Sequence, residues 1–423
     1  AVTTGLRNTL IGGLAGDALT DADDNVALGN LALSSDTLGS RSVAIGKEAL
    51  FSQTFTSATN TYNTAVGAFA GNAVTTGVNN TLIGGQAGDH ITTGASNVAV
   101  GYDALGDTTT GGDNTAVGEL ALSNNTTGIR NVAVGSSALF TKTTGNDNTA
   151  IGTGSLYSTT TASFNTGVGQ NTLELNTTGA NNVAVGVQAL RANTTASNNT
   201  AVGKDALLAN TTGYENTAVG KDSLTANTTG FRNQSFGTAS LLANTTGEDN
   251  TSLGQSSMQT NTTGDKNTAV GNYALKSATT ADNNTAVGYY SLYANTTGAT
   301  NTAIGGNALT ANTTGAANTA VGNGAGDNVT TGSNNSFLGL DTGYNLTTGS
   351  ANIYVGYNNT ASAVDVSNEL LIGSNADGGG TNTVKLQTTG GSATLGLDGS
   401  DTSWAAASDS RLKKDVATSA VGL

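Results

Sequence analysis

The sequence predicts an all-β protein, a parallel β-roll or β-solenoid with 17-residue coils and about 22 coils in all. Three observations predict it. Twenty-two glycines end the same short phrase, from Gly12 to Gly373, and twenty of the 21 intervals between them are 17 residues. Val, Ile, Leu or Phe precedes every one of these glycines, and the chain contains no proline. A fixed short period is typical of a solenoid, in which each repeat stacks on the last.

Composition narrows the class of partner. The 423 residues include 59 glycines, only 10% are charged, and the formal net charge is −14. An acidic chain is repelled by nucleic acid and by anionic membrane surfaces, so we expect neither as a partner. The sequence contains no run of about 20 apolar residues, so we expect no segment that inserts into a membrane. The absence of cysteine excludes disulfides and thiolate metal ligands, and we expect no cofactor and no metal.

Each coil is expected to open with a three-residue strand, such as Thr217-Ala218-Val219. Side chains alternate along a strand, so Thr217 and Val219 share one face and Ala218 takes the other. We expect the Val219 position to form the core, because it is aliphatic or aromatic in every repeat. The Ala218 position is small in most repeats, which predicts that another copy of the chain packs closely against it.

The rest of the coil is read from the residues that follow Gly220. The pair Ser223-Leu224 is expected to be a second strand, and Asn227-Thr-Thr-Gly230 the turn between coils. The asparagine that opens each strand, here Asn216, is expected to stack in an amide ladder. The predicted structural residues of the coil are therefore Asn216, Ala218, Val219, Gly220, Leu224, Asn227 and Gly230.

An isolated stack of such coils looks marginally stable. Each coil has two sizeable apolar side chains, worth roughly 2–3 kcal/mol each when buried. Ordering a residue costs roughly 1–2 kcal/mol of backbone entropy. A second apolar face buried between chains would close this gap, and so the sequence predicts an oligomer.

The strand phrase resembles a known family. Asn-Val-Ala-Val-Gly at 97–101, 131–135 and 182–186 resembles the head repeats of trimeric autotransporter adhesins, and the long repeat is similar to those of phage tail fibres. The resemblance covers residues 1–373, the predicted shaft. It implies a homotrimeric rod of parallel β-rolls with two short strands in each coil.

A second resemblance lies at the C-terminus. Residues 408–416, Ser-Asp-Ser-Arg-Leu-Lys-Lys-Asp-Val, resemble the start of the endosialidase-type intramolecular chaperone of phage tail spikes. In that family the chaperone assembles the trimer and is released by a cut between the Ser and the Asp, here Ser408 and Asp409. Residues 408–423 are much shorter than that domain, so we expect a truncated motif, with no catalytic residue assigned and Ser408–Asp409 as the possible processing junction.

Residues 374–407 are predicted to form a β-rich C-terminal segment. Residues 383–387 and 393–397 alternate like strands, with a glycine-rich break between them. Trp404 is expected to plug a trimer core, with contact to a sugar as the alternative.

Two other parts of the chain depart from the regular coil. Phe337, Tyr354 and Leu371 replace the small residue of the strand, which predicts a wider axis and different packing between chains. The insertion at 51–62 is expected to bulge.

Three patterns suggest chemistry, and each has a plainer interpretation. His90 is the only histidine; we expect a solvated turn residue, with a metal or anion site on a trimer axis as the alternative. Residues 322–326 look like a phosphate loop but lack the Lys and helix, so we expect simple backbone geometry. The acidic cluster favours an ordinary charged turn over calcium, because its spacing matches no EF-hand; its members are Asp17, Asp21, Asp23 and Asp24.

Asn-x-Ser/Thr motifs recur along the predicted turns. We expect them to serve turn geometry, with N-glycosylation in a eukaryotic secretory setting as the alternative. They begin at Asn125, Asn176, Asn193, Asn210, Asn227, Asn244, Asn261, Asn295 and Asn312.

The function these observations favour is a structural, non-enzymatic extracellular fibre, either a phage tail fibre or a surface adhesin. Its expected partners are further copies of itself and a receptor or glycan on a host surface. The alternatives are an end-to-end assembling filament and an ice-binding solenoid. An enzyme is disfavoured, because solenoid lyases and glycosidases have irregular coils and clustered carboxylates.

Overall fold

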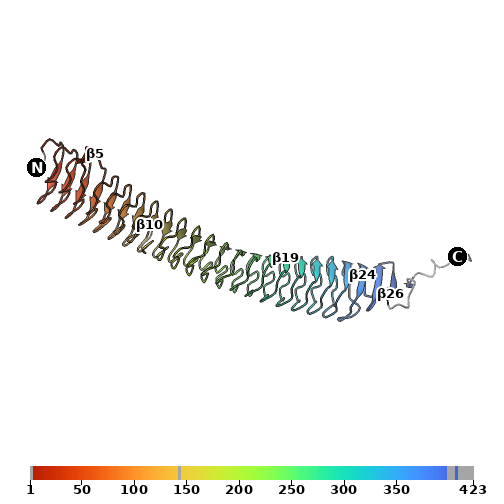
Figure 1. The fold of residues 1–423 in the computed structure, drawn as a ribbon. Helices are drawn as coiled ribbons and strands as arrows, with labels where there is room; N and C mark the ends of the chain where they lie inside the picture. The colour runs from red at the N-terminus through yellow and green to blue at the C-terminus, as the bar shows by residue number, and fades with distance from the viewer. Residues whose placement is uncertain (1–2, 142–143, 398–404, 408–423) are drawn as a thin grey trace, which may run out of the picture. The chain divides into compact units, whose positions relative to one another are not determined.

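The computed structural model, which describes residues 3–141, 144–397 and the strand at 405–407, confirms the parallel β-solenoid. The described residues form short strands and turns and contain no helix. The chain divides into two compact units, Ala1–Thr229 and Gly230–Leu423. Within each unit one short strand of every coil lies beside the strand of the next (Figure 1), and the units hold about 22 coils between them.

In the first unit the strands form a parallel ladder, except for the separate parallel pair β3 (Gly39–Ser40) and β5 (Thr59–Asn60). The ladder strands are β1 (Thr9–Ile11), β2 (Val26–Leu28), β4 (Val43–Ile45), β6 (Thr64–Val66), β7 (Thr81–Ile83), β8 (Val98–Val100), β9 (Thr115–Val117), β10 (Val132–Val134), β11 (Thr149–Ile151), β12 (Thr166–Val168), β13 (Val183–Val185), β14 (Thr200–Val202) and β15 (Thr217–Val219).

In the second unit the ladder is parallel up to β25 and antiparallel after it. The parallel strands are β16 (Gln234–Phe236), β17 (Thr251–Leu253), β18 (Thr268–Val270), β19 (Thr285–Val287), β20 (Thr302–Ile304), β21 (Thr319–Val321), β22 (Ser336–Leu338), β23 (Ile353–Tyr357), β24 (Glu369–Ser374) and β25 (Thr383–Thr388). They are followed by β26 (Gly391–Gly396) and β27 (Ala405–Ala407). The strands expected at 383–387 and 393–397 are thus β25 and β26.

The coils are held in register by amide ladders, as predicted. The backbone N–H of Asn182 donates to Asn165 Oδ1 at 3.0 Å, and Asn182 Nδ2 donates to the same oxygen at 3.2 Å and to the Ala196 carbonyl at 2.9 Å. These asparagines are fully buried. A ladder of this kind satisfies buried polar atoms without water, because each coil supplies the partner that its neighbour needs.

The glycine at the end of each strand allows this close stacking. Gly203 has φ of +139°, a conformation that side chains rarely adopt. A Cβ atom added there would lie 2.6 Å from the carbonyl carbon of Gly220 in the next coil. The 17-residue glycine period is therefore set by the approach of backbone to backbone.

The two faces of the strand are reversed from the sequence-based prediction. Ala201 and Ala218 are completely buried inside the chain, whereas Val219 is half-buried and Val202 is 36% exposed on the outer face. The interior is narrow: a Cβ at Gly167, which takes the alanine position in its coil, would lie 2.6 Å from Ser155 Oγ and would already touch Leu156 Cδ1 at 3.5 Å. Small residues are needed there because the leucine of the same chain fills the coil, and packing by another copy is not involved.

The second strand of the coil was also predicted wrongly. The pairs after the glycine, such as Ala206-Leu207, lie in turns. Leu190, Leu207 and Leu224 have φ near +52°, which costs about 1–2 kcal/mol for a residue with a side chain. This cost is offset by full burial of the leucine and by bonds between coils, such as Leu207 N–H to the Ser223 carbonyl at 3.0 Å. A strand is too straight to close so narrow a coil.

The bulky residues near the C-terminus do not widen an axis between chains. Phe337, Tyr354 and Leu371 are buried within their own chain, and the rings of Phe337 and Tyr354 stack with centroids 5.7 Å apart. These coils make room for the Phe337 ring by placing glycine in the turn at the position where leucine stands in most coils. A Cβ at Gly326 would lie 2.8 Å from the Phe337 ring, and a Cβ at Gly343 would lie closer still.

The insertion at 51–62 leaves the main ladder intact. Val43 still pairs with Thr64 across the 21-residue step, and the insertion supplies β5, which pairs with β3 of the preceding coil. A buried polar cluster anchors them: Gln53 Nε2 donates to Asp36 Oδ2 at 2.6 Å, and Asn63 Nδ2 donates to Gln53 Oε1 at 2.9 Å.

A second asparagine ladder runs through the turns. Asn193 Nδ2 donates to Asn176 Oδ1 at 2.8 Å and to the Ala196 carbonyl at 3.0 Å. In the second unit Ala278 and Val329 interrupt this ladder. The Oδ1 atoms of Asn261 and Asn312, each one coil earlier, are buried without a hydrogen-bond partner.

Replacing the strand-end glycine should destabilise the solenoid. We expect Gly203→Ala to cost about 2 kcal/mol or more, because the strained φ and the clash with Gly220 add together. The measurement is the thermal unfolding midpoint by circular dichroism. Thr212→Ala, in an exposed turn of the same unit, is the control and should leave the midpoint nearly unchanged.

Completing the second ladder should do the opposite. Ala278→Asn places an amide one coil beyond Asn261, where its Nδ2 can donate to the orphaned Oδ1 and its own Oδ1 can accept from Asn295. We expect a gain of about 1 kcal/mol in denaturant unfolding. Thr280→Asn, on the exposed side of the same turn, controls for composition; an equal gain there would contradict the ladder explanation.

Candidate interaction surface

The outer face of the ladder carries an apolar column, defined here as the residue just before each strand-end glycine. Its members are aliphatic or aromatic and half-buried or exposed wherever the structure describes them. Ile151 and Leu253, one in each unit, are 40% and 48% exposed. Isolated exposed apolar residues are normal, but a continuous row along a sheet is typical of an interface.

A second column on the same face is mostly threonine, with valine in several coils, as at Val98 and Val183. The first strand residue, such as Thr200 or Thr217, points outward beside the apolar column, because both flank the buried alanine. Cross-strand pairing keeps both columns in register from coil to coil. The outer face is thus a regular array of mostly threonine and aliphatic side chains.

The predicted structural residues take two kinds of position. Asn216, Ala218, Leu224 and Asn227 are fully buried, and Gly220 has φ of +134°. Val219 instead belongs to the apolar column. Gly230 begins the second unit, where its N–H donates to the Thr245 carbonyl at 3.4 Å.

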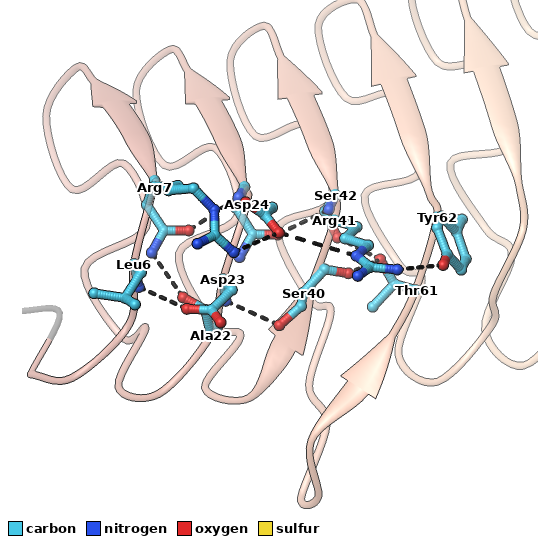
Figure 2. A network of polar contacts seen from close by, with 12 residues as sticks. Leu6, Arg7, Ala22, Asp23, Asp24, Ser40, Arg41, Ser42, Thr61 and Tyr62 are labelled. Atoms are coloured by element: carbon cyan, nitrogen blue, oxygen red, sulfur yellow. Dashed lines mark hydrogen bonds and ion pairs between the residues drawn. The ribbon is translucent and has the colours of Figure 1, made fainter.

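Two members of the acidic cluster, Asp23 and Asp24, make contacts between neighbouring coils (Figure 2). Arg7 Nε and Nη2 donate to the two carboxylate oxygens of Asp24 at 2.5 and 3.1 Å, and Arg41 lies 4.0 Å from Asp24. The hydrogen bond from Arg7 holds the pKa of Asp24 below its usual value. Asp23 accepts the N–H of Leu6 at 2.6 Å.

The remaining acids complete the same picture. Asp21 accepts from the Thr4 hydroxyl at 2.9 Å, and Asp17 lies in the turn after Gly12. Among residues 3–141 and 144–397, no three His, Cys, Asp or Glu side chains gather where they could hold a metal ion. The described carboxylates of Asp21, Asp23 and Asp24 thus accept hydrogen bonds from the neighbouring coil.

His90 is the exposed turn residue that the sequence predicts. Its side chain is 62% exposed, and Nδ1 lies 3.1 Å from Asp89 Oδ1 and 3.8 Å from Asp107 Oδ1. Partial desolvation opposes protonation, but the two carboxylates and the Gly106 carbonyl outweigh it, so the pKa of His90 lies above its usual value. For the half-buried Asp89, desolvation has the opposite sign and raises the pKa of the carboxyl group, although the attraction of His90 opposes this shift.

The other motifs serve backbone geometry. Residues 322–326 occupy the ordinary turn of the coil, with positive φ at Gly322, Gly324 and Gly326. The asparagines of the Asn-x-Ser/Thr motifs are fully buried, and Asn176 Nδ2, for example, donates to the Gly179 carbonyl at 3.0 Å. A buried and bonded Nδ2 is not accessible for glycosylation in the folded coil.

A buried carboxylate near the C-terminus escaped the sequence analysis. Glu369 ends the first amide ladder, at the position that asparagine holds in most coils. Its carboxylate accepts from the Tyr354 hydroxyl at 2.7 Å and from the Gly380 N–H at 2.8 Å, and burial raises the pKa of Tyr354. The sequence signal was the single Glu in the asparagine column. A cleft of about 210 Å³ between β23, β24 and β25 lies beside it.

Some predictions fall on other parts of the chain. Trp404 and the Ser408–Asp409 junction lie outside the described residues. Over the residues that the structure does describe, no helix is long and apolar enough to cross a membrane. A scan against protein-family models finds no family that matches this chain, and a search of curated proteins finds no match.

The pKa of His90 gives a direct test of the local geometry. A raised pKa means that this contact stabilises the fold below the unfolded value of about 6.5, and that the effect is lost as pH rises through the folded value. We expect a small effect on stability because the ring is mostly exposed. Proton NMR of the single histidine should give a pKa above 6.5 that falls in Asp107→Asn; Asp113→Asn should leave it unchanged.

Proposed function

We propose that this chain is a structural, non-enzymatic extracellular fibre that associates with copies of itself and presents a receptor-binding or adhesive region. The observation that carries the proposal is the apolar column, present in each unit on the outer face of the ladder. In this arrangement the outer face, and not the buried alanine face, meets the neighbouring chain.

The area of the column supports self-association. Fully burying a Val, Leu or Ile side chain is worth 1.5–3 kcal/mol at about 25 cal/mol per Å², which corresponds to roughly 60–120 Å². Ile11 and Val202 mark the range of the exposed members, at 58% and 36%, and the other members are half-buried. The roughly 800 Å² per partner of a standard interface therefore needs the apolar column of many coils together with the threonines beside it. A second copy of the same repeat matches this column coil for coil.

The number of chains and the setting come from the resemblance stated above. Heads of trimeric autotransporter adhesins and phage tail fibres are trimeric, so we propose a homotrimer on a cell or virion surface, with a host receptor or glycan as its target. Both a phage tail fibre and a surface adhesin are consistent with this proposal. End-to-end assembly into a filament remains the alternative mode of association.

Ice binding is the second candidate, because one observation favours it. The Thr-Thr pairs of the turns do not form a flat array: Thr211 Oγ1 bonds to the Thr228 carbonyl, while Thr212 points to solvent. The strands do form one, with threonine and aliphatic columns in register on the outer face. That face is free for ice only if no other chain covers it.

The test is the solution mass by light scattering, with variants on and off the column. We expect three chains in the parent protein and a shift to single chains in the double variant Ile151→Lys, Leu253→Lys, because ammonium groups in an apolar interface cost several kcal/mol each. Resistance of the oligomer to SDS without heating should be lost in parallel.

The matched control is Leu175→Lys, which changes a leucine of similar exposure in a turn off the outer face. It should leave the mass unchanged. A folded single chain in the parent protein would contradict self-association, and thermal hysteresis measured on that species would then decide for ice binding.

A further inference from the structure

Four tyrosines gather on two adjacent turns of the second unit. Tyr273 follows β18, and Tyr289, Tyr290 and Tyr293 follow β19. The turns are stacked directly, since the N–H of Tyr290 donates to the Asn272 carbonyl. The chain has 11 tyrosines in all, so this is a marked local concentration.

Tyr290 is the centre of the cluster. Its ring centroid lies 4.3 Å from that of Tyr289, 4.6 Å from that of Tyr293 and 5.2 Å from that of Tyr273. The distances to Tyr293 and Tyr273 are ordinary for tilted aromatic pairs, and the sequence neighbours Tyr289 and Tyr290 lie slightly closer. Hydrogen bonding with Tyr289 raises the pKa of Tyr290 above its usual value. The rings support one another and form a fixed platform.

Lys276 places a positive charge on this platform. Its Nζ lies 5.2 Å from the ring centroid of Tyr273 and 5.6 Å from that of Tyr293. Lys204 and Lys221, in contrast, pair with the neighbouring Asp205 and Asp222. Within the described parts of the chain no carboxylate lies at ion-pair distance from Lys276. The ammonium group of Lys276 therefore contacts aromatic rings and can still pair with an anionic ligand.

One side of the platform is open. Tyr289 is 55% exposed, and the equivalent position in the next coil is Gly306, which has no side chain to cover the ring. Exposed aromatic rings with hydroxyl groups suit a ligand that has both an apolar face and many hydroxyls.

We propose that this tyrosine platform binds an acidic saccharide, with a pyranose ring stacked on Tyr289 and its carboxylate paired with Lys276. Tyrosine hydroxyls would bond the sugar hydroxyls. A cationic ligand such as choline does not fit, because the ammonium of Lys276 already occupies the rings. The net charge of −14 does not forbid an anion, since charges beyond a Debye length of about 8 Å are screened. The inference rests on the proposed role of the chain as a fibre that meets a surface glycan.

The experiment is calorimetric titration of the full chain with a hyaluronan hexasaccharide and, separately, with the neutral chitohexaose. We expect the acidic sugar to bind more tightly and to weaken as salt rises. Tyr289→Ala should reduce the affinity about tenfold or more, and Lys276→Met should reduce it for the acidic sugar alone. Lys276→Met keeps the apolar stem over the rings, so only the charge is removed.

Two matched controls are present in the chain. Tyr102→Ala removes an equally exposed tyrosine at the same position of another coil, and Lys221→Met removes a lysine already paired with an acid. Both should leave binding unchanged. No binding of the acidic sugar, equal binding of both sugars, or an equal loss in Tyr102→Ala would overturn the proposal.

The solution mass of each variant separates this inference from the proposed function. An intact oligomer that does not bind the sugar contradicts the saccharide site alone, whereas a single chain that binds it contradicts self-association alone. A change of mass in Tyr289→Ala would instead make the platform part of the contact between chains and would overturn the saccharide site.

Discussion

The backbone contact between successive coils is the constraint on which the rest of the structure depends. Every coil must present its hydrogen-bonding groups to the next at the spacing of a parallel ladder, and the strand-end glycine, as at Gly203, permits that approach. A side chain at this point would push two backbones apart. The glycine period, the buried asparagines and the αL leucines all follow from keeping identical coils in register.

Core volume is the second constraint. The sequence satisfies it because the size of the buried strand residue and the size of the buried turn residue compensate each other. Alanine in the strand is combined with leucine in the turn through most of the ladder. Where the strand residue is large, as at Leu82 or Phe337, the turn carries glycine; Cβ atoms at Gly71 and Gly88 would meet Leu82, as those at Gly326 and Gly343 would meet Phe337. A coil this narrow has room for one large side chain, whichever of the two positions supplies it.

Function is left to the outer surface, because the interior is occupied by ladders and packing. The outer face repeats an apolar column along each unit and suits repeated contact with a like chain. The tyrosine platform breaks the repeat at a few positions and suits a single ligand. Repetition therefore favours assembly, and departures from repetition are the places where specific recognition can arise.

The sequence by itself determined the coil length, the parallel stacking and the asparagine ladder at positions such as Asn182, because periodicity is local. Strand alternation likewise located β25 and β26, although their antiparallel pairing came from the structure. It did not determine which face of the strand is inside. The alternation of side chains along a strand assigns Ala218 and Val219 to opposite faces, but it does not say which face points into the coil. Only the closed coil decided this, since Leu224 folds back in an αL turn and leaves room for alanine alone. The platform around Tyr290 likewise needed the tertiary structure, which brings residues 17 apart in sequence into contact.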